Sequence, residues 1–205
     1  MPHSTLSISE PGARLPLEDA DLRIWPAAFD ACAASQLFDE LLAGIAWRQE
    51  EVLIFGQRRL VPRLVAWHGD ATARYTYSGT PHVPLPWTPP LERIRARVRE
   101  LTGHSFNAVL LNLYRDGRDG MGWHADDEPE LGRDPVIASV SLGAVRRFRM
   151  RHRRRKDCRL DLSLPDGSLL LMAGATQHHW VHAVPKTAIP VGKRINLTFR
   201  QVSLT

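Results

Sequence analysis

Two stretches of the chain carry hydrophobic residues at the spacing of an amphipathic helix. The first follows Asp30, a good N-cap residue, and can end at Gly44; the second follows Thr88 and Pro89 and can end at Gly103. The apolar stripes are Leu37, Phe38, Leu41, Leu42 and Ile45 in the first stretch and Leu91, Ile94, Val98 and Leu101 in the second. We therefore expect two helices, each with one face against a core.

After Gly103 the hydrophobic period changes from helical to alternating, which is typical of short strands. The segments are 106–114, 137–143, 146–152, 159–165, 168–174 and 194–204, separated by Gly, Pro, Asp or Lys. They predict a mainly β, α+β fold: a sandwich or barrel supported by the N-terminal helices. No repeat or linker divides residues 15–205, so we expect one domain, preceded by a disordered segment 1–14 that is rich in Ser, Pro and Gly.

Length and composition narrow the class of protein further. The chain has 205 residues, of which 43% are hydrophobic, enough to bury one substantial core. It shows no apolar run long enough for a membrane span and no secretory signal, so we expect a cytoplasmic protein without membrane contact, and a monomer. Cys32 and Cys158 are far apart, which argues against a disulfide framework or a zinc site.

Positive charge is concentrated in one segment. Residues 146–159 hold nine basic residues and one acid, a net charge of +8 in a chain whose total is +5. As a strand, this segment would alternate Phe148 and Met150 with arginines and then turn near residues 154–157. Arginines on the outside of a hairpin suit contacts with nucleic-acid phosphates, although a merely solubilising face is the alternative.

The stretch "YRDGRDGMGWHADDE", residues 114–128, contains a candidate metal site. His124 and Asp126 would share one face if this piece is extended. Downstream, His178, His179 or His182 could supply a third ligand. Two histidines and one carboxylate typically bind one side of an octahedral iron(II), whereas zinc prefers more nitrogen or sulfur ligands. The alternative is that these are ordinary loop histidines.

The strand "RINLTFR" adds a second indication. Its alternation places Arg194, Asn196, Thr198 and Arg200 on one face, opposite Ile195, Leu197 and Phe199. Two arginines that face a barrel interior require anionic partners, and a dicarboxylate would supply two. An iron site beside such a slot is what a 2-oxoglutarate oxygenase requires. Surface arginines alternating with core residues are the alternative.

The ordered motifs "NLY", "HADDE", "WVH" and "RINLTFR" resemble the AlkB family of iron(II)- and 2-oxoglutarate-dependent nucleic-acid dealkylases, from about Ile24 onward. The resemblance implies a double-stranded β-helix, or jelly roll, with Fe(II), 2-oxoglutarate and O2 as cofactor and cosubstrates. It implies iron ligands at His124, Asp126 and His182, because His182 stands in the W-x-H pattern. The implied 2-oxoglutarate contacts are Asn112, Tyr114, Arg194, Asn196, Thr198 and Arg200, with Arg200 nearer the iron.

Within this family, "VLIFGQRRLVPR" and "ARYTYSG" look most like the branch acting on double-stranded DNA, with a nucleotide-recognition lid at about residues 50–80. The resemblance implies that Phe55 fills the gap left by a flipped base and that Tyr77, with Tyr75, stacks on the damaged base; both could instead be core aromatics. The acidic pair Asp127 and Glu128 suits a cationic methylated base. The expected phosphate contacts are Arg58, Arg59, Arg63, Arg153, Arg154, Arg155 and Lys156.

The function implied by this resemblance is oxidative demethylation of bases such as 1-methyladenine and 3-methylcytosine in alkylated DNA, releasing succinate, CO2 and formaldehyde. Two alternatives stay open. The same chemistry could act on single-stranded DNA or RNA, where a finger at Phe55 would have no gap to fill. The chain could also be a non-catalytic nucleic-acid-binding module, which intact metal ligands and both slot arginines argue against.

Overall fold

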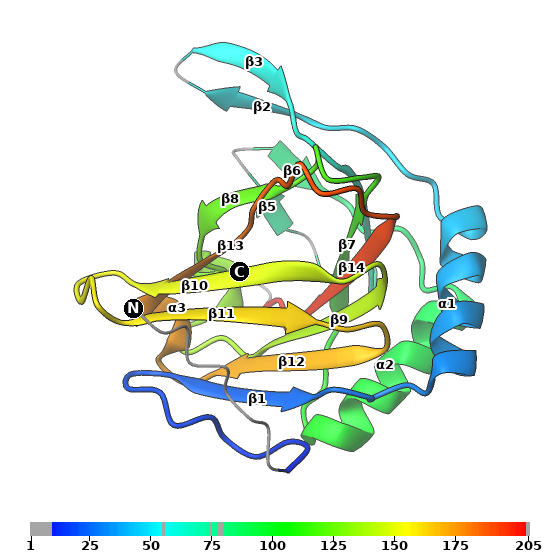
Figure 1. The fold of residues 1–205 in the computed structure, drawn as a ribbon. Coiled ribbons are helices and arrows are strands. Elements are labelled where there is room, and N and C mark those ends of the chain that lie inside the picture. The colour runs from blue at the N-terminus through cyan, green and yellow to red at the C-terminus, as the bar shows by residue number, and fades with distance from the viewer. Residues whose placement is uncertain (1–9, 55, 74, 78–79, 204–205) are drawn as a thin grey trace.

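A computed structural model describes residues 10–54, 56–73, 75–77 and 80–203. In this part of the chain, antiparallel strands form a larger sheet of six strands and a smaller sheet of four (Figure 1). The strand order of the larger sheet is β1 (Asp21–Trp25), β12 (Ser168–Ala173), β9 (Ile137–Gly143), β14 (Arg194–Arg200), β7 (Ala108–Tyr114) and β4 (Leu64–Gly69). The order of the smaller sheet is β11 (Arg159–Leu164), β10 (Arg146–His152), β13 (Trp180–Val184) and β8 (Met121–His124). Side chains of both sheets share one core cluster, so the sheets face each other as in the expected jelly roll.

Both expected helices are confirmed. In α1 (Ala31–Gly44) the Asp30 carboxylate accepts a hydrogen bond from the Ala33 N–H, which caps the first turn. After α2 (Pro89–Thr102) the chain turns through Gly103 at φ 74°, a left-handed conformation that suits glycine. Thr88 occupies the N-cap position of α2, but its side chain makes no capping hydrogen bond.

The helices cover the outer face of the larger sheet (Figure 1), and their apolar stripes pack on β14, β7, β9 and β12. Ile195, Leu197 and Phe199 of β14 contact this helical layer. The other face of β14 points into the space between the sheets, where Asn196 and Thr198 line a cavity. β14 is therefore buried on both faces, which explains why its polar residues are all at most 8% exposed.

Two hairpins follow α1. The first joins β2 (Glu51–Ile54) to β3 (Gln57–Leu60), with Ile54 paired to Gln57 and Gly56 at φ 75°. Every residue of β3 is exposed, and Figure 1 shows this hairpin projecting away from the two sheets. The second joins β5 (Tyr75–Tyr77) to β6 (Thr80–His82). Phe55, the expected finger residue, lies outside the described residues.

The N-terminal segment differs from the expectation of disorder up to residue 14. The Gly12 N–H donates to the Ile24 carbonyl at 2.8 Å, and Arg14 forms an isolated bridge with Arg23 of β1. From Gly12 onward this segment is therefore paired with the edge of the larger sheet. Among the described residues, no helix combines the length and apolarity that crossing a membrane would require.

Candidate metal centre and cosubstrate site

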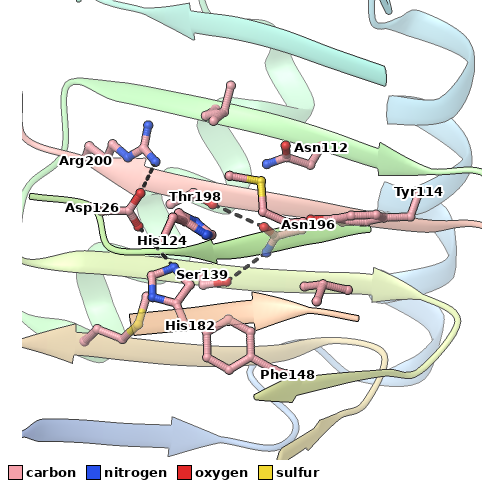
Figure 2. Close-up of a pocket in the computed structure, with 14 residues that line it drawn as sticks. Asn112, Tyr114, His124, Asp126, Ser139, Phe148, His182, Asn196, Thr198 and Arg200 are labelled. Atoms are coloured by element: carbon pink, nitrogen blue, oxygen red, sulfur yellow. Dashed lines mark hydrogen bonds and ion pairs between the residues drawn. The ribbon is translucent and has the colours of Figure 1, made fainter. Parts of the chain in front are cut away.

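Three ligand types meet where β8 and β13 lie side by side in the smaller sheet. His124 ends β8 and is the register partner of His182 on β13, and Asp126 follows β8 (Figure 2). One ligand atom from each of these residues lies within 4.8 Å of the others. Asp126 and His182 are buried and His124 is half-buried. The structure therefore assembles the predicted His-Asp-His group, with His182 as its third member.

Neighbouring groups orient the two imidazoles. Nδ1 of His124 lies 2.9 Å from the Gly122 carbonyl, so Nδ1 carries the proton and Nε2 keeps the lone pair that a metal needs. The His182 ring is stacked on Phe148, with ring centroids 5.2 Å apart. Its Nε2 lies 3.7 Å from Oδ2 of Asp126. These contacts hold both rings in position for one shared ion.

Electrostatics favour the ligand forms of these side chains. Burial raises the pKa of Asp126, but the nearby charges of Arg200, His182 and His124 outweigh it and lower the pKa to about 2. Burial and the neighbouring His124 lower the pKa of His182 to about 3, against the opposing effect of Asp126. A carboxylate and a neutral imidazole are the forms that bind a divalent cation.

Gln177 is a supporting residue that the sequence analysis did not identify. It lies in α3 (Thr176–His179) with no exposed surface, and its Oε1 accepts a hydrogen bond from the backbone N–H of Asp126 at 3.0 Å. It thereby fixes the chain segment that carries the carboxylate ligand. A single glutamine that belongs to no recognisable motif gives no indication in the sequence of this contact.

Five of the six predicted 2-oxoglutarate contacts line the same cavity as the metal group. They are Asn112, Tyr114, Asn196, Thr198 and Arg200. Asn196 donates to the Ser139 hydroxyl at 2.8 Å and accepts from Thr198, while Arg200 donates to Oδ1 of Asp126 at 2.5 Å (Figure 2). Arg200 therefore lies at the metal end of the polar face, as expected. The space in this cavity that the centre of a water molecule can occupy has a volume of about 30 Å³.

Arg194, the sixth predicted contact, does not line this cavity. It lies beside Tyr114, with its guanidinium carbon 5.4 Å from the ring centroid, and is 1% exposed. Its Nη2 donates to the Ser141 hydroxyl, but Nε and Nη1 are buried without a hydrogen-bond acceptor among the described residues. Burial lowers the pKa of Arg194, against the effect of the Tyr114 hydroxyl. A buried cation with two unused donors fits a ligand carboxylate, as 2-oxoglutarate would provide.

Two other arginines are buried where the sequence analysis expected phosphate contacts or a basic surface. Arg63 is 5% exposed and its Nε donates to Oδ1 of Asn112 at 2.7 Å, so it orients a cavity residue and is not placed to bind phosphate. Arg146, in the basic segment, donates to the carbonyls of Asp116, Asp119 and Pro185. The periodicity of the sequence does not distinguish these two buried arginines from the exposed arginines next to them.

Several expected substrate and phosphate contacts pair with each other or with nearby residues. Arg153 donates to Asp127 at 2.6 Å, so two residues assigned to different roles form one ion pair. The remaining pairs are Arg155 with Glu18, Arg58 with Glu51 and Arg59 with Gln57. Arg154 and Lys156 stand in the turn between β10 and β11, as expected. Tyr75 and Tyr77 lie in β5, and their roles stay predictions.

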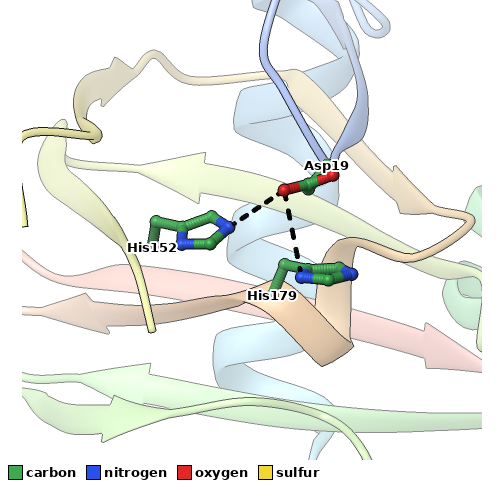
Figure 3. Close-up of side chains that lie close together, drawn as sticks. All are labelled: Asp19, His152 and His179. Carbon is green, nitrogen blue, oxygen red and sulfur yellow. Dashed lines mark hydrogen bonds and ion pairs between the residues drawn. The ribbon is translucent and has the colours of Figure 1, made fainter. Parts of the chain in front are cut away.

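The two histidines rejected as iron ligands have other partners. His178 lies 3.0 Å from Asp134, and His179 and His152 surround Asp19 (Figure 3). Nδ1 of His152 accepts from two backbone N–H groups, those of Arg154 and Arg155. Nε2 of a neutral His152 therefore carries the proton and donates to Asp19 at 3.3 Å, which leaves no lone pair there for a metal. This cluster ties the N-terminal segment to the β10–β11 turn.

The sequence profile of the 2OG-Fe(II) oxygenase superfamily matches residues 21–200. The chain belongs to this superfamily. Its His-Asp-His group and its buried Arg194 fit the iron(II) and the 2-oxoglutarate to which the superfamily's name refers. Solved structures with this fold include "The structure of OsALKBH1", which has a TM-score of 0.63 at 15% identity; the match covers 94% of this chain and 97% of that chain. An oxidoreductase of the 2OG-Fe(II) oxygenase family from Burkholderia pseudomallei has a TM-score of 0.56 at 16% identity and covers 89% of this chain and 87% of its own.

Curated relatives confirm the resemblance to the AlkB family. The mouse "DNA oxidative demethylase ALKBH2" is 42% identical over 184 residues, which are 85% of this chain and 77% of the relative. The human "Alpha-ketoglutarate-dependent dioxygenase alkB homolog 3" is 40% identical over 188 residues, 87% of this chain and 65% of the relative. The chain thus spans just under two thirds of the length of the alkB homolog 3 proteins.

Proposed function

We propose that this chain is an oxidative dealkylase of nucleic-acid bases, with N-methylated DNA as its substrate. The observation that carries the proposal is that the His124, Asp126 and His182 group shares one cavity with three residues of the polar face of β14, Asn196, Thr198 and Arg200. The name of the ALKBH2 relative, "DNA oxidative demethylase", supports the same reaction class. Bound iron(II), with 2-oxoglutarate and O2, would supply oxidation of the N-methyl carbon, which leaves as formaldehyde while 2-oxoglutarate becomes succinate and CO2.

The chain's own residues hold and shield the reactants. His124, Asp126 and His182 would hold the metal, and Arg200 keeps the Asp126 carboxylate charged and oriented. Arg194 would bind the far carboxylate of 2-oxoglutarate through its unused donors. Phe148 and Met172 also line the cavity, and their apolar surface would limit the access of water.

An acidic group near the cavity supports a cationic substrate. Glu128 is half-buried, and its Oε2 is buried without a hydrogen-bond partner among the described residues. The methylated bases 1-methyladenine and 3-methylcytosine are cationic, whereas undamaged bases are neutral. A carboxylate at this place would therefore discriminate in favour of the lesion.

We further propose that duplex DNA is the preferred substrate. The projecting β2–β3 hairpin supports this, because a residue at its turn could enter the gap that a flipped base leaves. The exposed Arg58 and Arg59 of β3 lie close enough in sequence to contact the flanking phosphates. Phe55 is the residue to which we assign the gap-filling role.

One assay tests both levels of the proposal. Formaldehyde release is measured from methylated single-stranded DNA, duplex DNA and RNA, with and without iron(II) and 2-oxoglutarate. Release that requires both, and is fastest on duplex DNA, is the expected result. Release only from single strands or RNA would overturn the duplex preference, and no release from any substrate would overturn the dealkylase assignment.

A further inference from the structure

Trp123 precedes the metal ligand His124 but faces the other side of the smaller sheet. The inward positions of β10 are Phe148 and Met150, so Arg149 and Arg151 point outward. Both guanidinium groups lie over the Trp123 ring, at 4.3 Å for Arg151 and 5.9 Å for Arg149. With 39% of its surface exposed, Trp123 is a large aromatic side chain that the core does not use.

A recess of about 260 Å³ opens beside this indole. Its wall includes Trp123, Pro62, Pro185, Arg149 and Lys186. The volume falls just below the roughly 300–1,000 Å³ of sites for drug-sized ligands, so a single flat ring system fits better than a larger molecule. Trp123 and the two prolines supply the apolar surface on which such a ring can lie.

The recess adjoins the metal cavity. Met121 and Val184 line both spaces, so the two are neighbours at β8 and β13. At the other side, the Gly120 N–H donates to the Pro62 carbonyl, which joins the recess to the base of the β2–β3 hairpin. A nucleic-acid strand that delivers a base to the metal cavity would therefore pass close to Trp123.

Charge on this face favours a polyanion. Asp161 pairs with both Arg147 and Arg149. Arg151 and Lys186 form no ion pair with any described residue. Charge alone would also attract an acidic peptide, but an aromatic platform beside cations without acidic partners is the arrangement by which proteins bind single-stranded nucleic acid, with bases stacked and phosphates paired.

We propose that the recess beside Trp123 binds an unpaired base next to the target base, and that Arg151 and Lys186 bind the adjoining phosphates. The inference rests on the proposed function, because it places the substrate strand across the metal cavity. It applies to single-stranded segments, since in an intact duplex the neighbouring bases stay paired and stacked. The recess thus serves single strands, whereas the β2–β3 hairpin serves duplexes.

Binding of a fluorescent, unmethylated single-stranded oligonucleotide to the metal-free protein tests this site by anisotropy. Stacking on an aromatic ring is worth about 1–3 kcal/mol per base, so Trp123→Ala should weaken binding roughly 5- to 150-fold, while Trp123→Phe retains most of the affinity. Arg151→Ala should weaken binding and flatten the slope of log affinity against log salt by about 0.7. Arg99→Ala, an exposed arginine on α2, is the matched control and should leave binding unchanged.

Wild-type affinity in Trp123→Ala, with thermal unfolding showing a folded variant, would overturn the proposal. So would equal weakening on single strand and duplex, or competition by polyglutamate as effective as that by the oligonucleotide. Because this assay uses no iron, 2-oxoglutarate or lesion, its outcome is independent of catalysis. If the wild type releases formaldehyde and Trp123→Ala binds the oligonucleotide normally, only the proposed recess is refuted. If Trp123→Ala weakens oligonucleotide binding and the wild type releases no formaldehyde, only the dealkylase assignment is refuted.

Discussion

Two buried arginines flank Tyr114, and they are expected to respond in opposite ways to the same substitution. The guanidinium carbons of Arg194 and Arg146 lie 5.4 and 5.7 Å from the Tyr114 ring centroid. Arg146 donates to three backbone carbonyls, whereas two nitrogens of Arg194 have no acceptor among the described residues. We therefore expect Arg194 to bind a ligand and Arg146 to have a structural role.

Arg194→Met should stabilise the protein in the absence of 2-oxoglutarate. Replacing buried ionic groups by apolar ones of similar volume often stabilises by about 1–4 kcal/mol, and for a chain of this size each kcal/mol shifts Tm by about 2–4 °C. We therefore expect Tm to rise by about 2 °C or more. Arg146→Met should lower it, because one buried and two part-buried carbonyls lose their donor, and an unsatisfied buried group costs about 1–3 kcal/mol.

The same variant should lose its response to 2-oxoglutarate. A hydrogen bond to a charged group is worth about 1.5–3 kcal/mol, so two lost donors correspond to a roughly 100-fold or greater rise in the 2-oxoglutarate requirement. Both effects are measured by calorimetric unfolding in the presence of a divalent metal that does not support turnover. The Tm without 2-oxoglutarate reports the change in stability, and the rise in Tm on adding 2-oxoglutarate reports its binding. An Arg194→Met variant that is destabilised like Arg146→Met, or that keeps the wild-type shift with 2-oxoglutarate, would refute the reasoning.

Three further outcomes are expected. Asp126→Ala should abolish formaldehyde release while circular dichroism shows an intact fold, and His182→Ala should do the same; an inactive His178→Ala beside an active His182→Ala would show that the wrong histidine was assigned. Phe55→Ala should lose activity on methylated duplex but keep it on the matching single strand, whereas equal losses with lowered thermal stability would indicate a core residue. The metal-free protein should become less stable as pH falls from about 7 to 5. The unfolded chain protonates His182 near pH 6.5 and the folded chain only near pH 3, so the unfolded state binds more protons between these values. Urea titrations at the two pH values measure this slope, which His182→Gln should flatten; a wild-type slope of opposite sign would contradict the pKa assignment.

Alternation and helical period were sufficient to predict the elements that pack on the core, because burial on one face leaves a direct trace in the sequence. Both helices and the six strands read from residue 106 onward are present. β8 and β13 were not read as strands, since "MGWH" and "WVHAV" are short and interrupted by functional residues. The metal ligands nevertheless came from residue chemistry and the motif resemblance, which do not depend on recognising those strands.

The sequence did not show which arginines are buried or paired and which are exposed. Arg63, Arg146 and Arg153 each occur in basic stretches that suggest a phosphate-binding surface. The fold buries the first two against carbonyl or amide oxygens and pairs the third with Asp127. These partners lie 26 to 49 residues away in sequence, and a one-dimensional pattern carries no information about such contacts.

β14 lies in the middle of the larger sheet, between β9 and β7, although every other strand in the described part of the chain precedes it in sequence. During synthesis, β7 and β9 therefore present open edges until the residues up to Arg200 have left the ribosome. Pairing across such long separations is slow, and unpaired edges are prone to aggregation in the meantime. A nascent chain arrested before Arg194 would lack the β14 residues that line the metal cavity and the arginines expected to bind 2-oxoglutarate. The larger sheet is thus complete only when β14 has paired with both of its neighbours.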